Sequence, residues 1–310
     1  MRKILNFVGM PAMRVVALAL AMTGIIASAA TAQTPVPQTS ANAAALLDKH
    51  AQLASELAKN QYRRPLFLES AETDRNVSSV AYAVLDSPFS TVSATFNKPS
   101  RWCDILILHL NTKYCHAAAS TNPGTLTVHI GKKTPQRLTE TSSLEFSYRV
   151  SAATPNYLAV QLHADKGPLS TNNYRLEIQA AALASGKTFI YFRYSYDYGI
   201  TGRLAMQTYL STLGRGKVGF TQVVRDGQTE FVSGMRGTVE RNTMRYYLAM
   251  EAYLASLKQA PEEQLTTRLQ YWFDATEEYS RQLHELDRAS YLTMKQAEYQ
   301  RQQAPPEAFE

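Results

Sequence analysis

The sequence lacks the short motifs that mark the common enzyme classes. A GxSxG nucleophile elbow, an HExxH metal motif, a phosphate-binding P-loop and the glycine pattern of dinucleotide-binding folds are all absent. The six histidines are scattered, and four of them lie in or beside expected strands: His109, His116, His129 and His163. These absences favour a non-catalytic protein without a cofactor. An enzyme that positions a reactive substrate with Tyr, Arg and Glu side chains stays open.

Cysteine is scarce, and the chain's two cysteines lie close together. Cys103 and Cys115 bracket a short segment, so in an exported protein they are expected to form a disulfide, worth about 3 kcal/mol for such a loop. Two free thiols are the first alternative. A zinc site with His109 and His116 is the second, but its spacing matches no common zinc pattern, and no metal is expected.

The N-terminus has the features of a secretory signal peptide, expected to end at residue 32. Three cations, Arg2, Lys3 and Arg14, accompany an apolar run at 15–29 and a small-residue cleavage signal at 30–32. The run is short for a membrane span, although an uncleaved anchor is an alternative. We therefore expect a periplasmic or secreted protein.

Charge does not indicate nucleic-acid binding. Removing residues 1–32 takes away three cations and no acids, which lowers the formal charge from +6 to +3. A surplus this small, spread over the chain, favours solubility and gives no basic footprint for a nucleic acid. With 45% hydrophobic residues and 18 tyrosines, the chain is expected to be globular.

Hydrophobic periodicity divides the rest of the chain into helical and extended parts. A linker and N-terminal helix are expected over 33–77, with the helix at 41–60. A strand at 80–85 precedes two short helical pieces divided at Pro99. Alternating apolar and polar residues then predict an antiparallel meander with one buried face. Its six runs are 113–119, 125–131, 144–150, 158–163, 174–179 and 188–198.

Helical spacing returns after the meander. The patterns predict a helix at 201–213, a hairpin at 217–233 around Asp226-Gly227, and a helix that Thr238 caps and that runs to Lys258. A long helix with an apolar stripe should occupy most of the C-terminal region, 259–310. That helix is expected to dock on its own domain or to form a homodimer.

This element order resembles the helix-grip fold of the START-like superfamily, which includes lipid-transfer domains and polyketide cyclases. The resemblance covers roughly residues 78–258 and rests on topology, with DSPF (86–89) entering the first helix and WCDIL (102–106) opening the next segment. It implies an α+β fold in which a curved antiparallel sheet of about seven strands grips a long helix. The helix at 201–213 or the one at 238–258 can fill the sheet.

The resemblance also implies a cavity for an apolar ligand between the sheet and that helix. Its expected ligand-binding residues come from the second short helix, the last strand and the start of the long helix: Trp102, Tyr191, Arg193, Tyr194, Tyr196, Glu240, Arg241, Arg245 and Tyr246. Two arginines on adjacent turns can hold a carboxylate or phosphate. The alternative is a structural Arg/Glu network paired within the protein.

The sequence thus predicts an exported, non-catalytic protein that binds a hydrophobic small molecule or lipid. A cyclase or hydrolase of the same fold, and a structural or assembly protein that acts through the C-terminal helix, are the alternatives.

Overall fold

The computed structural model describes residues 38–118, 124–200, 202–204, 208 and 216–304. The signal-peptide prediction lies outside the described residues. So does most of the predicted helix at 201–213, of which 202–204 and 208 are helical. The chain from Pro37 to Glu310 forms one compact unit.

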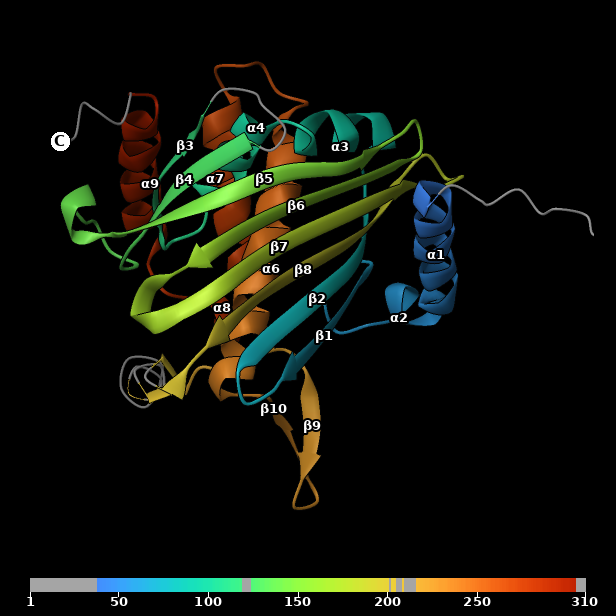
Figure 1. Ribbon diagram of the computed structural model, residues 1–310, viewed down its shortest axis with the longest axis horizontal. Coiled ribbons are helices and arrows are strands. Elements are labelled where there is room, and N and C mark those ends of the chain that lie inside the picture. The colour runs from blue at the N-terminus through green and yellow to red at the C-terminus, as the bar shows by residue number, and fades with distance from the viewer. Residues whose placement is uncertain (1–37, 119–123, 201, 205–207, 209–215, 305–310) are drawn as a thin grey trace, which may run out of the picture. The chain divides into compact units, whose positions relative to one another are not determined.

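A single antiparallel sheet of eight strands is the centre of this unit (Figure 1). Its order is β1-β2-β8-β7-β6-β5-β4-β3. The predicted meander is present, but the sequence pattern does not predict β1, and β2 begins earlier than expected. The strands are β1 (Leu66–Glu72), β2 (Asn76–Leu85), β3 (Thr112–Ala117), β4 (Gly124–Ile130), β5 (Ser142–Ala153), β6 (Tyr157–Lys166), β7 (Thr171–Ala182) and β8 (Thr188–Tyr198).

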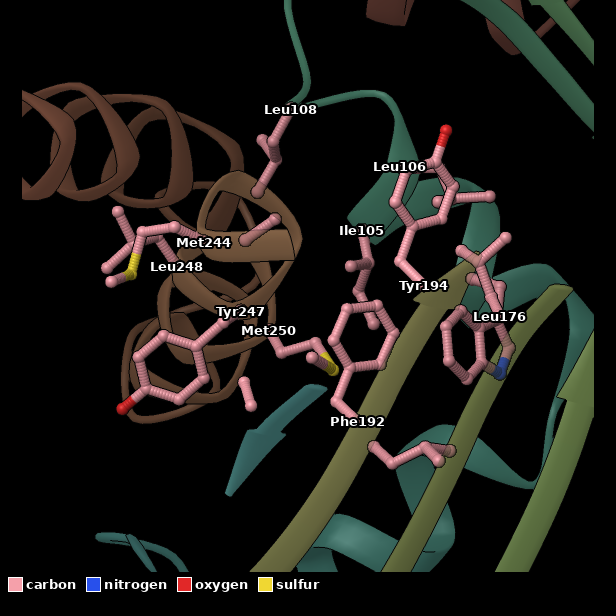
Figure 2. Close-up of a cluster of buried hydrophobic side chains, with 14 of the residues drawn as sticks. Ile105, Leu106, Leu108, Leu176, Phe192, Tyr194, Met244, Tyr247, Leu248 and Met250 are labelled. Atoms are coloured by element: carbon pink, nitrogen blue, oxygen red, sulfur yellow. The ribbon is translucent and has the colours of Figure 1, made fainter. Parts of the chain in front are cut away.

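The long helix α6 (Gly234–Ser256) packs on one face of this sheet, against β1, β2 and β8. Figure 2 shows Met244, Leu248 and Met250 of α6 in one buried cluster with Phe192 of β8. The predicted α+β class and helix-grip arrangement are confirmed, with eight strands instead of about seven. The helix that fills the sheet is the second of the two candidates.

The start of α6 differs from the prediction. Ser233 occupies the N-cap position, and Gly234 follows it with a positive φ of 63°. Thr238 lies inside the first turns, where its hydroxyl donates to the carbonyl of Gly234 at 2.9 Å. A threonine can bond backwards to the preceding turn as readily as it caps a helix, so the residue type alone did not fix the boundary.

Shorter helices cover both faces of the sheet. On the α6 face, α3 (Phe89–Phe96) packs on β6 and β7, and α4 (Pro99–Leu106) packs on β3 and β4. On the opposite face, α1 (Gln38–Gln52) packs on β7 and β8, and α2 (Ala54–Ala58) follows it. The α6 face is buried along the sheet, whereas on the opposite face α1 buries only a patch that includes Tyr157, Ala181 and Phe189.

The predicted long C-terminal helix is broken into three. These are α7 (Gln264–Glu277), α8 (Ser280–Leu283) and α9 (Arg288–Gln302). Asp287 caps α9 by accepting a hydrogen bond from the Ser290 amide at 3.0 Å. The apolar stripe is buried nevertheless, because α7 packs on α6 while α9 packs on α7 and β3. This segment therefore docks on its own domain, which was one of the two arrangements expected from the sequence.

Two further predicted features are present. The Asp226-Gly227 turn joins β9 (Gln222–Arg225) to β10 (Gln228–Phe231), and both turn residues have positive φ, as a tight hairpin turn of this kind requires. Cys103 of α4 and Cys115 of β3 form the expected disulfide. Among the described residues, none of the helices is both long and apolar enough to cross a membrane.

Candidate functional site

A cavity of about 130 Å³ lies where α6 and the segment after α4 face the sheet. Most of its lining is apolar or aromatic, and polar side chains gather on the 109–112 segment and on α6. Figure 2 shows Tyr194 near Leu106 and Leu176, which line the same cavity. The full lining is Leu106, His109, Asn111, Thr112, Val128, Ile130, Leu144, Phe146, Leu162, Pro168, Tyr174, Leu176, Tyr194, Tyr196, Thr238, Asn242 and Tyr246.

Four tyrosines form one wall of the cavity. Tyr174 stacks on Tyr196 with ring centroids 5.1 Å apart, and Tyr194 contacts Tyr246 edge-on at 5.4 Å. Burial raises the pKa of each hydroxyl, to about 12 for Tyr174. The hydroxyls therefore stay neutral at physiological pH and offer hydrogen bonds beside large apolar rings.

His109 is a deeply buried group of the lining, with 3% of its surface exposed. Its ring stacks on Tyr246 at 4.9 Å. Burial lowers the pKa of His109 well below its usual value, and the positive charges of Arg245 and Lys295 lower it further. The imidazole is consequently neutral at pH 7, when an ordinary histidine would be partly protonated.

The segment that carries His109 is held by a buried ion cluster. Lys295 of α9 donates to the carbonyls of His109 and Thr112, at 3.0 and 2.7 Å. It also pairs with Glu298 at 2.6 Å, and Lys113 pairs with the same carboxylate at 2.9 Å. The C-terminal helix thus positions the polar end of the cavity.

The predicted ligand-binding residues fall into three groups. Tyr194, Tyr196 and Tyr246 line the cavity together. Trp102 lies in the core beside Phe96, whose carbonyl accepts its indole N–H at 2.9 Å.

Tyr191 and Arg193 point to the other face of the sheet, because successive residues of a strand alternate between faces. There Tyr191 packs with the cluster under α1, against Tyr82. These two side chains and Trp102 do not line the cavity.

The remaining three predicted residues form hydrogen bonds or ion pairs within the protein. Arg245 pairs with Glu285 at 2.8 Å, and Arg241 donates to the Val218 carbonyl at 3.2 Å. Glu240 is fully buried and accepts the backbone N–H groups of Phe220 and Thr221, at 2.6 and 2.9 Å.

The Ser70 hydroxyl also donates to Glu240, and Arg236 donates to that hydroxyl at 2.7 Å. The chain passes very close to this carboxylate, because a Cβ atom at Gly219 would lie only 2.5 Å from Glu240 Oε2. Glu240 therefore ties α6 to β1 and to the chain that leads into the hairpin.

Replacing Glu240 by glutamine is expected to lower the free energy of unfolding by about 2–3 kcal/mol, because charge-assisted hydrogen bonds to the buried carboxylate are lost. Urea denaturation measures the change, and Glu262→Gln, at an exposed position, is the control. A stable Glu240→Gln protein with impaired ligand binding would instead place Glu240 in the binding site.

Sequence reasoning missed His109, Thr112, Tyr174 and Asn242 as cavity residues. The sequence could have indicated Asn242 as a cavity residue, because Asn242 lies four residues before Tyr246 and therefore on the same helix face. It holds no such indication for His109, since the burial of His109 depends on contacts with segments far away in the chain.

Among the described residues, no group of three or more His, Cys, Asp or Glu side chains is placed to hold a metal ion.

Comparisons with known proteins find solved structures that are similar to this chain. No protein-family model and no curated protein matches the chain. Human StAR-related lipid transfer protein 5 is 8% identical, covers 72% of this chain and 99% of its own, and has a TM-score of 0.36. Ara h 8.0201 is 7% identical, with 62% of this chain and 99% of that chain covered and a TM-score of 0.31. A protein from Arthrobacter aurescens, solved by NMR, is 8% identical, with 47% and 81% covered and a TM-score of 0.29.

Proposed function

We propose that this chain is an exported, non-catalytic protein that binds a hydrophobic small molecule or the end of a lipid between α6 and the sheet. The observation that carries the proposal is the aromatic-lined cavity beside α6, with polar side chains on the 109–112 segment and on α6. Apolar linings with a few placed polar groups are typical of small-molecule sites. Export rests on the signal-like segment at residues 1–32.

The size of the cavity restricts the ligand. A volume of about 130 Å³ is close to the roughly 150 Å³ of an engineered apolar cavity that accepts benzene. Pockets for drug-sized ligands are larger, about 300–1,000 Å³. A single ring or a short acyl segment therefore fits the cavity as it stands, whereas a sterol or a whole phospholipid requires α6 to move away from the sheet.

Ligand extraction and a direct binding assay test this proposal. Mass spectrometry of organic extracts of the purified full-length protein is expected to recover a small apolar compound. Adding toluene or octanoate should raise the thermal unfolding midpoint, because a ligand that binds only the folded state stabilises it by mass action. Phosphatidylcholine vesicles and cholesterol test the larger ligands.

A cavity-filling variant links binding to this cavity. Ile130 is half-buried and lines it, so Ile130→Phe should abolish the shift with toluene. The control is Leu292→Phe, at a half-buried position on α9 outside the lining. Extracts without ligand, together with no shift for any of the four additives, would rule the proposal out.

A further inference from the structure

We infer that the ligand of this cavity carries a carboxylate or an equivalent anionic acceptor, which is bound by His109 Nε2–H and the Thr112 hydroxyl. The inference rests on the proposed function and narrows it from an apolar ligand to a small aromatic or acyl acid. Neither residue belongs to the Arg/Glu cluster that the sequence suggested for an acidic head group.

The tautomer of His109 follows from its backbone partner. The amide N–H of Asn111 donates to His109 Nδ1 at 3.1 Å, so Nδ1 is an acceptor. A neutral imidazole with Nδ1 as acceptor carries its proton on Nε2, which is then a donor. By distance and angle, this buried Nε2 has no hydrogen-bond partner among the described residues. The nearby Asn242 side chain raises the pKa of His109 but does not reach hydrogen-bonding geometry. A ligand acceptor in the cavity would satisfy it.

Thr112 supplies a second buried donor in the same wall. Its side chain is fully buried and lines the cavity, and within the described part of the chain its Oγ1 has no hydrogen-bond partner. A buried polar atom without a partner costs about 1–3 kcal/mol, and such atoms are rare in folded proteins. Two of them on one short segment facing one cavity indicate a polar ligand group between them.

Asn242 extends this polar wall onto α6. Its amide is close enough to raise the pKa of His109 and to lower the pKa of Tyr194. An amide can donate to one oxygen of a carboxylate while His109 and Thr112 donate to the other. His109 and Thr112 lie on the segment that Lys295 of α9 holds, and Asn242 lies on α6.

The charges around the cavity determine the sign of the ligand's charge. Arg245, Lys295 and Lys133 all act on His109 as positive charges. Lys113 and Lys295 share the single carboxylate of Glu298, and Arg245 and Lys133 share that of Glu285. The field at His109 is therefore positive, which opposes a cationic ligand and stabilises an anionic one in a low-dielectric site.

Three probes of similar size test the inference on the full-length protein at pH 7.5. Benzoate carries the anionic acceptor, nitrobenzene is its neutral isostere, and toluene reports on the apolar cavity alone. Isothermal titration calorimetry should show benzoate binding about 10-fold tighter than nitrobenzene, as expected for charge-assisted hydrogen bonds.

Two substitutions should remove that preference without emptying the cavity. His109→Phe keeps the ring beside Tyr246 but removes the donor, so benzoate should bind no tighter than nitrobenzene while toluene affinity changes less than threefold. Thr112→Val should weaken benzoate about 3- to 10-fold, and it keeps the inference testable if His109→Phe does not fold. His50→Phe is the matched control, because His50 packs on Phe189 on the other face of the sheet.

The outcomes separate the inference from the proposed function. Binding of toluene with equal affinities for benzoate and nitrobenzene would overturn the anionic acceptor and leave the apolar binding site standing. Tight binding of benzoate to both His109→Phe and Thr112→Val would overturn it in the same way. Failure of all three probes to bind would overturn the inference, whereas the proposed function falls only if the organic extracts and the four additives also show no ligand.

Discussion

Replacing Glu298 by glutamine is expected to lower the free energy of unfolding by about 3–5 kcal/mol. The side chains of Lys113 and Lys295 are fully buried, and both ammonium groups pair with this one carboxylate. Removing it leaves two buried cations without their counter-ion, which costs more than the net contribution of the intact cluster. Urea denaturation with the disulfide intact measures the loss.

The pH dependence of this loss is a second readout. Burial lowers the pKa of Lys295 to about 8. The penalty in Glu298→Gln should therefore be larger at pH 6.5 than at pH 9.5, where Lys295 has given up its proton. Glu262→Gln, at an exposed position, should change stability by less than about 0.5 kcal/mol at either pH. A comparably small loss in Glu298→Gln would show that the cluster does not hold α9 in place.

The second large effect is a steep loss of stability above pH 10. Burial raises the pKa of Tyr62 and Tyr174 to about 12, and it also raises the pKa of Tyr194, Tyr246 and Tyr291. An unfolded tyrosine ionises near pH 10, so each raised pKa contributes stability that is complete below pH 10 and is lost as pH rises through the folded-state value. A shift of two units corresponds to about 2.7 kcal/mol.

Several such groups together are comparable with the 5–15 kcal/mol that typically stabilises a domain, so most of the stability should be lost as the pH approaches 12. Equilibrium unfolding at pH 8, 10, 11 and 11.5, with phenolate absorbance as a second probe, checks the profile. The lowered pKa of Lys295 acts in the other direction between pH 8 and 10.5, so stability should not fall before pH 10. Tyr62→Phe should raise stability relative to wild type at pH 11 by more than at pH 8. A profile that stays flat from pH 9.5 to 11.5 would contradict the burial of these hydroxyls.

The sequence predicts the sheet and the gripping helix because their patterns are local. Alternation in 144–150 or 174–179 reports directly on which side of a strand is buried, and the spacing of apolar residues in 238–258 marks one helix face. The sequence pattern does not reveal β1, because the second half of this strand is largely exposed and the alternation of buried and exposed residues is therefore short. The C-terminal stripe is equally apolar whether the helix is continuous or broken, so it does not show the breaks.

The candidate site is harder to predict because its partners are distant. Arg245 meets Glu285 forty residues away, and Glu240 meets the Phe220 amide twenty residues away. No spacing rule connects such pairs, so an Arg/Glu cluster looks the same whether a ligand or the protein itself satisfies it. The sequence could have placed Tyr191 and Arg193 on the face opposite Tyr194 and Tyr196, because successive residues of β8 alternate between the two faces of the sheet.

The disulfide between Cys103 and Cys115 closes a covalent ring, and His109, Asn111 and Thr112 all lie on that ring. The tyrosine wall needs only the sheet and α6, whereas the donors sit on a loop whose closure depends on the surrounding redox conditions. Without the disulfide, that loop would still be held by Lys295, which donates to the carbonyls of His109 and Thr112, but not by a covalent bond. If the chain is exported, as we propose, oxidation would add a covalent constraint to the segment that carries the proposed donors.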